Sequence, residues 1–67
     1  MRKIGTIKVL DQLPPGFLAV KVLDGDIGVD DRVFGDPVER VIRLADNCCL
    51  IETEAPLGGG SEVWVMR

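Results

Sequence analysis

Residues 17–36 read FLAVKVLDGDIGVDDRVFGD, a strand-like run that leads into a stretch dense in aspartate and glycine. Within the run, Leu18, Val20 and Val22 alternate with other residues and would share one face of an extended strand. Aspartate and glycine at 24–25 suit the positive φ angles of a tight turn, so we expect the strand to end there.

The stretch that follows the turn predicts a short extended arm, a second turn and another strand. We place the second turn at Val29–Asp31 and expect Val33 to enter the core with the next strand. Ile27 and Val29 would then cover one end of the core.

The same acidic stretch, residues 24–36, also raises the question of a cation site, with Asp24, Asp26, Asp30 and Asp31 as candidate metal ligands. A calcium loop needs six to eight oxygen ligands from residues spaced to wrap inward. Counted from Asp24, the order of an EF-hand loop fails at its fifth, sixth and twelfth residues. We therefore favour turns over a metal site here.

The rest of the chain repeats the pattern of short β-rich runs separated by turn signals. Val63 and Val65 point one way in the C-terminal run, while Trp64 and Met66 point the other. Ile51 and Thr53 lie opposite Leu50, Glu52 and Glu54 in the run before it. Runs of this length and spacing predict an all-β fold, a small five- to six-stranded barrel or sandwich in a single domain over residues 1–67.

One segment, residues 37–46, is compatible with two structures. As a helix, Asp36 would be the N-cap and Pro37 the first helical residue, which gives an α+β alternative with one short helix. As a strand, its one face would hold Val38, Arg40, Ile42 and Leu44. The β-branched residues after the proline favour the strand.

The glycine run at 58–60 is equally open to interpretation. It can be an ordinary hairpin connection, an engineered joint between segments or a glycine nest for an anion. No helix start or basic residue follows it, so we favour an ordinary loop.

The segment GTI at 5–7 and the run GFLAVKVLDGDIGVDDRVFG at 16–35 together resemble the small β-barrel second domain of translational GTPases such as elongation factor Tu. The matching positions of the turn-and-strand motif are Gly25, Ile27, Val29, Asp31 and Val33. Asp30 departs from the family, which favours glycine there. The resemblance covers residues 5–35 and implies an all-β barrel that acts as a contact module; it assigns no functional residue, and fold analogy alone does not establish function.

The composition argues against several classes of function. The net charge is −3, and histidine and tyrosine are absent. Nucleic-acid binding needs a basic face, so we do not expect it, although Arg2, Lys3 and Lys8 lie close together in the sequence. Without histidine, the usual acid–base side chain near neutral pH is missing, so we expect neither an enzyme nor a cofactor.

The two cysteines, Cys48 and Cys49, are adjacent and would point to opposite faces of a strand, so they do not suit a mutual disulfide. We expect one to fill the core and the other to face outward, in a reducing compartment. An intermolecular disulfide through the outward thiol is the alternative.

These features predict a non-catalytic protein-interaction or assembly module. We expect its partner to be another protein or a second copy bound through strand edges, with Phe17, Trp64 and Met66 as interaction candidates. For Phe17 and Trp64, filling the core is the alternative role. A divalent-cation or small-ligand domain using the 24–36 loop is the alternative function. With no signal peptide and no apolar run long enough for a membrane span, we expect a cytoplasmic protein without membrane contact, of the size of accessory proteins from phages or mobile elements.

Overall fold

The computed structural model describes residues 1–67 and shows an all-β chain without helices. Its strands are β1 (Lys3–Leu13), β2 (Phe17–Gly25), β3 (Arg32–Val33), β4 (Asp36–Pro37), β5 (Arg40–Arg43), β6 (Cys48–Glu52) and β7 (Glu62–Met66). The all-β prediction is therefore confirmed. The count of seven exceeds the expected five or six because β3 and β4 are only two residues long.

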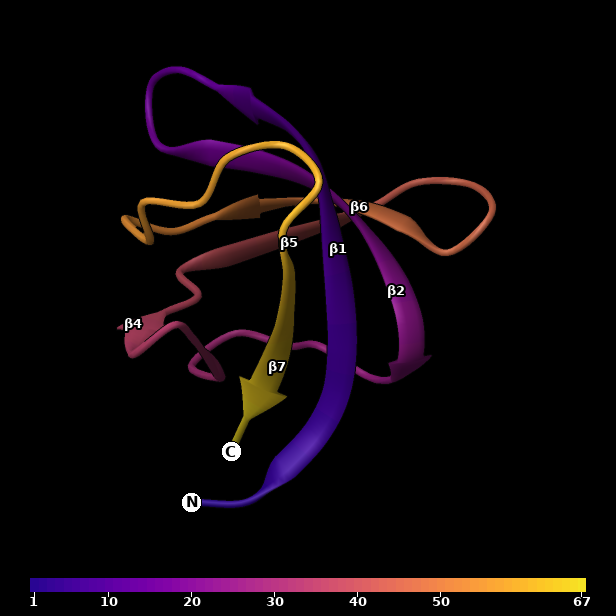
Figure 1. The fold of residues 1–67 in the computed structure, drawn as a ribbon, viewed down its shortest axis with the longest axis vertical. Helices are drawn as coiled ribbons and strands as arrows, with labels where there is room; N and C mark the ends of the chain where they lie inside the picture. The colour runs from indigo at the N-terminus through magenta and orange to yellow at the C-terminus, as the bar shows by residue number, and fades with distance from the viewer.

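All strands belong to one antiparallel sheet in the order β4-β3-β7-β1-β2-β6-β5, which curls into a half-barrel (Figure 1). The two outer strands of this order, β4 and β5, follow each other directly in the chain. The peptide between them bonds to both sides of the sheet. The Val38 N–H donates to the Asp31 carbonyl (2.8 Å) and the Glu39 N–H donates to the Glu52 carbonyl (2.8 Å). This connection draws the outer strands together around the core.

The strands at the two chain ends, β1 and β7, are neighbours in the middle of the sheet (Figure 1). The N–H groups of Arg2 and Arg67 each donate to the other residue's carbonyl at 2.8 Å. From Lys3 to Lys8, β1 is therefore paired with β7 on one side and, from Gly5 onward, with β2 on the other. The terminal runs form the centre of the sheet instead of its margins.

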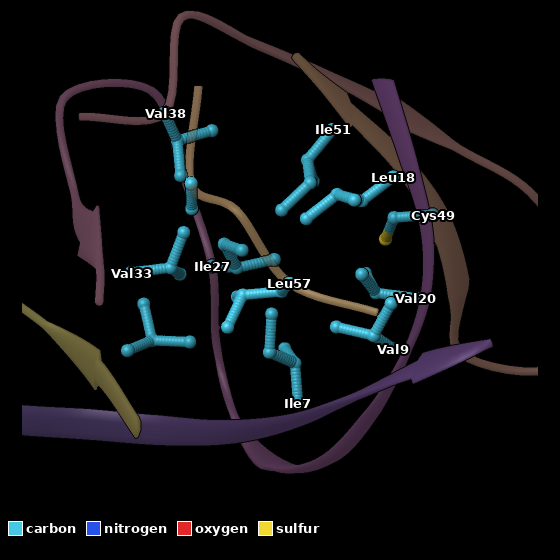
Figure 2. Packing of buried hydrophobic residues seen from close by; sticks show 12 residues of the cluster. Ile7, Val9, Leu18, Val20, Ile27, Val33, Val38, Cys49, Ile51 and Leu57 are labelled. Carbon is cyan, nitrogen blue, oxygen red and sulfur yellow. The ribbon is translucent and has the colours of Figure 1, made fainter. Parts of the chain in front are cut away.

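The core lies inside the curl and is almost entirely aliphatic (Figure 2). Its members are Ile7, Val9, Leu18, Val20, Ile27, Val33, Val38, Cys49, Ile51, Ala55, Leu57 and Val65. The predicted alternation holds on β2, β6 and β7: Leu18, Val20, Ile51 and Val65 are buried, and Val22 and Val63 are partly buried against the core. The single buried hydroxyl, on Thr53, donates to the Pro37 carbonyl at 3.0 Å and so stays paired inside the barrel.

Ile27 closes one end of this core from the connection between β2 and β3. Its side chain is fully buried, which contributes about 1.5–3 kcal/mol of hydrophobic stabilisation. Val29 was expected beside it, but that side chain is 56% exposed, so this part of the prediction is wrong. The predicted turn at Val29–Asp31 explains the difference, because the chain reverses there with Asp30 at a φ of 73°.

Residues 37–46 contain no helix but the end of β4, a two-residue connection and β5, and their alternation differs from the predicted one. Val38 is buried and Val41 packs against the core, whereas Arg40 and Ile42 are exposed. Two residues separate β4 from β5, and this interruption shifts the alternation by one position between Val38 and Arg40. β5 ends at Arg43, and the chain turns back toward β6 at 46–47, where both residues have positive φ.

Two glycines allow a close crossing of backbones near the start of β1. Gly25 has a φ of 69°, and a Cβ there would overlap the Ile4 carbonyl oxygen. A Cβ on Gly5, its partner in the β1–β2 register, would lie 2.7 Å from the Asp26 carbonyl oxygen. The sequence motif Asp24–Gly25 therefore ends β2 for steric reasons as well as for its turn preference.

The glycine run at 58–60 lies in the long connection between β6 and β7, which are not sheet neighbours. It is therefore not a hairpin turn. The Gly60 N–H donates to the Val9 carbonyl (2.7 Å) and the Val9 N–H donates to the Ser61 carbonyl (2.8 Å). Leu57 just before the run is buried in the core, so both sides of this loop are attached to the barrel.

Candidate functional site

Two of the three aromatic side chains lie exposed on the outer surface of the barrel. Trp64 is 60% exposed because β7 alternates, and burial of Val65 sends its neighbour outward. Phe34 is 65% exposed in the turn between β3 and β4, where its φ of 50° is uncommon for an aromatic residue. Since large apolar side chains normally gain free energy by burial, this paired exposure is the feature of the surface that most needs explanation.

These two aromatic residues line a shared hollow of about 380 Å³ on the outer face of β7. We call it the aromatic hollow; its lining residues are Phe34, Gly35, Glu62, Val63, Trp64 and Met66. Trp64 and Met66, predicted as interaction candidates, are therefore brought together as the alternation suggested. Phe34 was not predicted, because its position between Val33 and Gly35 indicated only a turn.

The margin of β7 beside the hollow has no neighbouring strand. β3 pairs with β7 only at Arg32–Met66 and Val33–Val65. The remaining residues of β7, Glu62–Trp64, pair with β1 alone. We call this stretch the free edge of β7. Backbone N–H and C=O groups on such an edge can accept another strand.

Two cations flank the hollow. The Lys3 Nζ lies 4.9 Å from the centroid of the Trp64 ring, and Arg32 donates from a guanidinium nitrogen to the Gly35 carbonyl at 3.1 Å. Neither side chain forms an ion pair; the three ion pairs of the structure are Arg40–Glu52, Arg43–Asp26 and Arg67–Asp31. The basic N-terminal run is apparent in the sequence, but the position of Lys3 over the Trp64 ring is not.

Phe17, the third predicted interaction residue, lies elsewhere. It is half-buried at the start of β2, opposite Leu13 on β1 and Glu52 on β6. The Arg40 guanidinium lies 5.5 Å from the centroid of its ring and also pairs with Glu52 at 3.4 Å. The structure therefore separates Phe17 from Trp64 and Met66 and gives it partners within the chain.

A second cavity, of about 350 Å³, adjoins Phe17 at the end of the β1–β2 hairpin. Its polar side chains are Gln12, Thr53 and Glu54. Thr53 is already bonded to the Pro37 carbonyl and to the Ala55 N–H. With one carboxylate and no cation among the lining residues, this cavity presents no convergent set of groups for a ligand.

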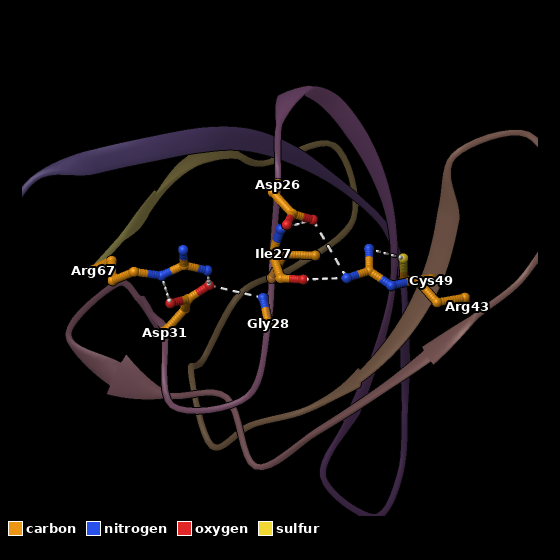
Figure 3. Close-up of polar contacts among 7 residues, drawn as sticks. All are labelled: Asp26, Ile27, Gly28, Asp31, Arg43, Cys49 and Arg67. Atoms are coloured by element: carbon orange, nitrogen blue, oxygen red, sulfur yellow. Dashed lines mark hydrogen bonds and ion pairs between the residues drawn. The ribbon is translucent and has the colours of Figure 1, made fainter.

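In the acidic 24–36 segment, Asp31 is committed to Arg67 (Figure 3). Arg67 donates to both carboxylate oxygens, at 2.8 and 3.0 Å, and the Gly28 N–H donates to one of them at 2.7 Å. The hydrogen bonds from Arg67 are the main cause that lowers the pKa of Asp31 below its usual value, against the opposing effect of burial. The same contact raises the pKa of Arg67. The ion pair attaches Arg67 to the connection between β2 and β3.

Asp26 has a similar arrangement nearer the surface. Arg43 on β5 contacts the Asp26 carboxylate at 3.4 Å and also donates to the Ile27 carbonyl (Figure 3). The arginine therefore closes the gap between β5 and the connection that carries Ile27. Two of the four predicted metal candidates thus have arginine partners, and Asp24 and Asp30 have none. No three His, Cys, Asp or Glu side chains lie together in a metal-binding group.

The cysteines follow the predicted division. Cys49 is 2% exposed within the core, and Cys48 on the opposite face of β6 is half-exposed. Both thiols are free, and Arg43 lies 3.9 Å from the Cys49 sulfur. The Cys48 thiol donates a hydrogen bond to the Asp46 carbonyl, at 3.6 Å.

No protein-family model, curated protein or solved structure matches this chain. None of the structure's elements is a helix with the length and apolar character needed to cross a membrane.

Proposed function

We propose that this chain is a non-catalytic protein-interaction module and that the aromatic hollow on β7 is its contact surface. The observation that carries the proposal is the joint exposure of Phe34 and Trp64 around one hollow. Aromatic side chains provide a large share of the binding energy in protein interfaces, and tryptophan is among the residues most enriched in their energetic centres.

The rigidity of the surface supports the proposal. Trp64 is held between Val63 and Val65, which face the core, and Thr6 opposes it on β1. Phe34 is fixed by the tight turn between β3 and β4, whose strands pair at Arg32–Pro37 and Val33–Asp36. Groups that are already positioned lose less conformational entropy on binding, so a small hollow of this kind suits recognition.

The test is capture of partners from an extract of the source organism, followed by reconstitution of the complex from purified proteins. Wild-type protein is compared with the double variant Phe34→Ala/Trp64→Ala and with Leu44→Ala. Leu44 is a suitable control because it is 54% exposed but follows β5, at the other end of the sheet order. Circular dichroism and thermal unfolding establish that each variant is folded.

We expect calorimetry on the reconstituted pair to show at least a tenfold weaker affinity for the double variant and no change for Leu44→Ala. That size follows from the loss of two aromatic anchors, each worth about 1–2 kcal/mol or more. A reconstituted partner that binds wild type and the double variant equally contradicts the proposal.

A further inference from the structure

We infer that the partner of the aromatic hollow is an extended acidic segment, which adds as a strand to the free edge of β7 and places an apolar side chain in the hollow. This inference rests on the proposed function and names the chemistry of its partner. It is carried by three features that meet at one place: an unpaired backbone, an apolar hollow and two unpaired cations.

The backbone sets the conformation of the partner. Glu62–Trp64 lacks a neighbour on the β3 side, although β3 itself pairs with the next two residues of β7. A strand laid on this edge would continue the position of β3 along β7, and three residues of it would span about 10 Å. Adding a strand to an edge supplies main-chain hydrogen bonds, and the adjoining pockets then select side chains.

A second incompletely paired margin in the middle of the sheet, that of β1, lacks these properties. Beyond Val9, β1 pairs with β2 only, because the β7 register ends at Lys8 and the Gly60–Ser61 loop bonds to Val9. There, the Asp11 carboxylate already accepts a hydrogen bond from the Gln12 N–H at 2.8 Å. A carboxylate directed at its own edge competes with an incoming strand, whereas none of the hydrogen bonds from side chains involves Glu62–Trp64.

The hollow sets the side chain that the added strand presents. Successive side chains of a strand alternate between its two faces, so a central residue directed outward would lie over Trp64 and Phe34. The lining of Phe34, Val63, Trp64 and Met66 favours an aromatic or branched aliphatic side chain.

The cations set the charge of the neighbouring partner residues. Lys3 on β1 and Arg32 on β3 both oppose Met66 in the lining of the hollow and have no carboxylate partners, whereas Arg40, Arg43 and Arg67 are already paired. Glu62 is the one acidic residue of the lining, and Lys8 opposes it across β1 and β7. Carboxylates beside the central apolar residue would therefore find unpaired cations. Because the chain as a whole carries −3, this attraction is local and acts within about one Debye length of 8–10 Å.

The experiment measures binding of a fluorescein-labelled synthetic peptide that has a central phenylalanine flanked by valines and, outside these, aspartates. Fluorescence anisotropy is recorded with the full chain at low and at physiological salt. Control peptides carry lysines in place of the aspartates, or N-methyl groups on the central backbone amides. The second control keeps every side chain but cannot pair as a strand.

We expect the acidic peptide to bind with micromolar affinity and to weaken several-fold between low and physiological salt. Trp64→Ala is expected to weaken it at least tenfold, and Lys3→Gln/Arg32→Gln several-fold, with Leu44→Ala unchanged. The N-methylated peptide and the lysine peptide are both expected to bind at least tenfold more weakly.

Several outcomes overturn the inference. Equal binding of the acidic and lysine peptides removes the role of the cations, and equal binding of the N-methylated peptide removes the added strand. Oligothymidylate that binds in a Trp64-dependent way where the peptide does not assigns the surface to single-stranded nucleic acid. A concentration-dependent dimer in sedimentation equilibrium that Trp64→Ala abolishes assigns it to a second copy of the chain. Failure of the peptide while a captured protein still depends on Phe34 and Trp64 overturns the acidic strand alone and leaves the proposed function standing.

Discussion

The two outer faces of this barrel contain similar side chains but use them differently. On the face formed by β2, β6 and β5, Phe17 is half-buried beneath the Arg40 guanidinium, and Arg40 is paired with Glu52. On the face formed by β3, β7 and β1, Phe34 and Trp64 are mostly exposed and no cation has a carboxylate partner. We call these the closed face and the open face.

Strand pairing explains the difference. On the closed face, Phe17 opposes Glu52 on β6 and Glu52 opposes Arg40 on β5, so three consecutive strands bring the three side chains into one row. On the open face, β3 is only two residues long and its pairing with β7 ends before Trp64. Phe17 is therefore covered because a third strand reaches its row, and Trp64 stays exposed because none reaches it.

The largest losses of stability are expected for substitutions in the core. The loss should be the same for a core residue of the closed face as for one of the open face. Val20 on β2 and Val65 on β7 are both fully buried. We expect Val20→Ala and Val65→Ala each to lower the free energy of unfolding by about 2–3 kcal/mol, because each removes two buried methyl groups and leaves a cavity. Urea unfolding monitored by circular dichroism measures both.

A Val65→Ala variant as stable as wild type, beside a destabilised Val20→Ala, would contradict this equality. It would mean that β7 is not packed on the core as β2 is. The open face would then be a loosely attached strand instead of a rigid binding surface.

The next effect tests the ion pair that attaches the chain end beside the open face. Asp31→Asn keeps the side-chain volume and an acceptor for the Gly28 N–H but loses the charge-assisted hydrogen bonds from Arg67. We expect it to lower the free energy of unfolding by about 1–3 kcal/mol at neutral pH. Asp26→Asn is the matched control, since its ion pair with Arg43 is exposed and should contribute about 0–1 kcal/mol.

The pH dependence has a defined sign. Because the folded state holds the pKa of Asp31 below its ordinary value, this group stabilises the fold above the ordinary pKa of aspartate, near 4. The contribution is lost as the pH falls through the lower, folded pKa. The melting temperature of wild type should therefore approach that of Asp31→Asn in acid, and a gap between the two that stays constant from pH 7 to pH 2 would contradict this role.

The sequence was sufficient for most of the core because core burial follows local alternation, whereas the row of Phe17, Glu52 and Arg40 on the closed face depends on long-range strand pairing. Leu18, Val20, Ile51 and Val65 all point inward as the period of two requires. The turn at Val29–Asp31 was also predictable from its aspartates. Val38 was wrongly grouped on one face with Arg40, Ile42 and Leu44, because the two residues between β4 and β5 shift the alternation and no local pattern marks such an interruption.

The open face was predictable only in part. Trp64 and Met66 could be paired with each other from alternation along β7. Phe34 could not be added, since its contact with them depends on β3 pairing with the far end of the chain. The positions of Lys3 and Arg32 depend on the same long-range pairing. Residues brought together by three strands distant in sequence leave no signal in any one of them.

The smallest effect is the most direct test of the comparison, because it places the same substitution on each face. We expect Phe17→Ala to lower the free energy of unfolding by about 1–2 kcal/mol, since it removes a half-buried ring and the packing of Arg40 on it. Phe34→Ala should change it by no more than about 0.5 kcal/mol, because a ring that is 65% exposed has little burial to lose, and the strain of its positive φ is not worsened. Parallel urea unfolding of the two variants measures the difference. If Phe34→Ala is the more destabilising of the two, its ring already has a partner within the chain, and the open face is not available to bind another protein.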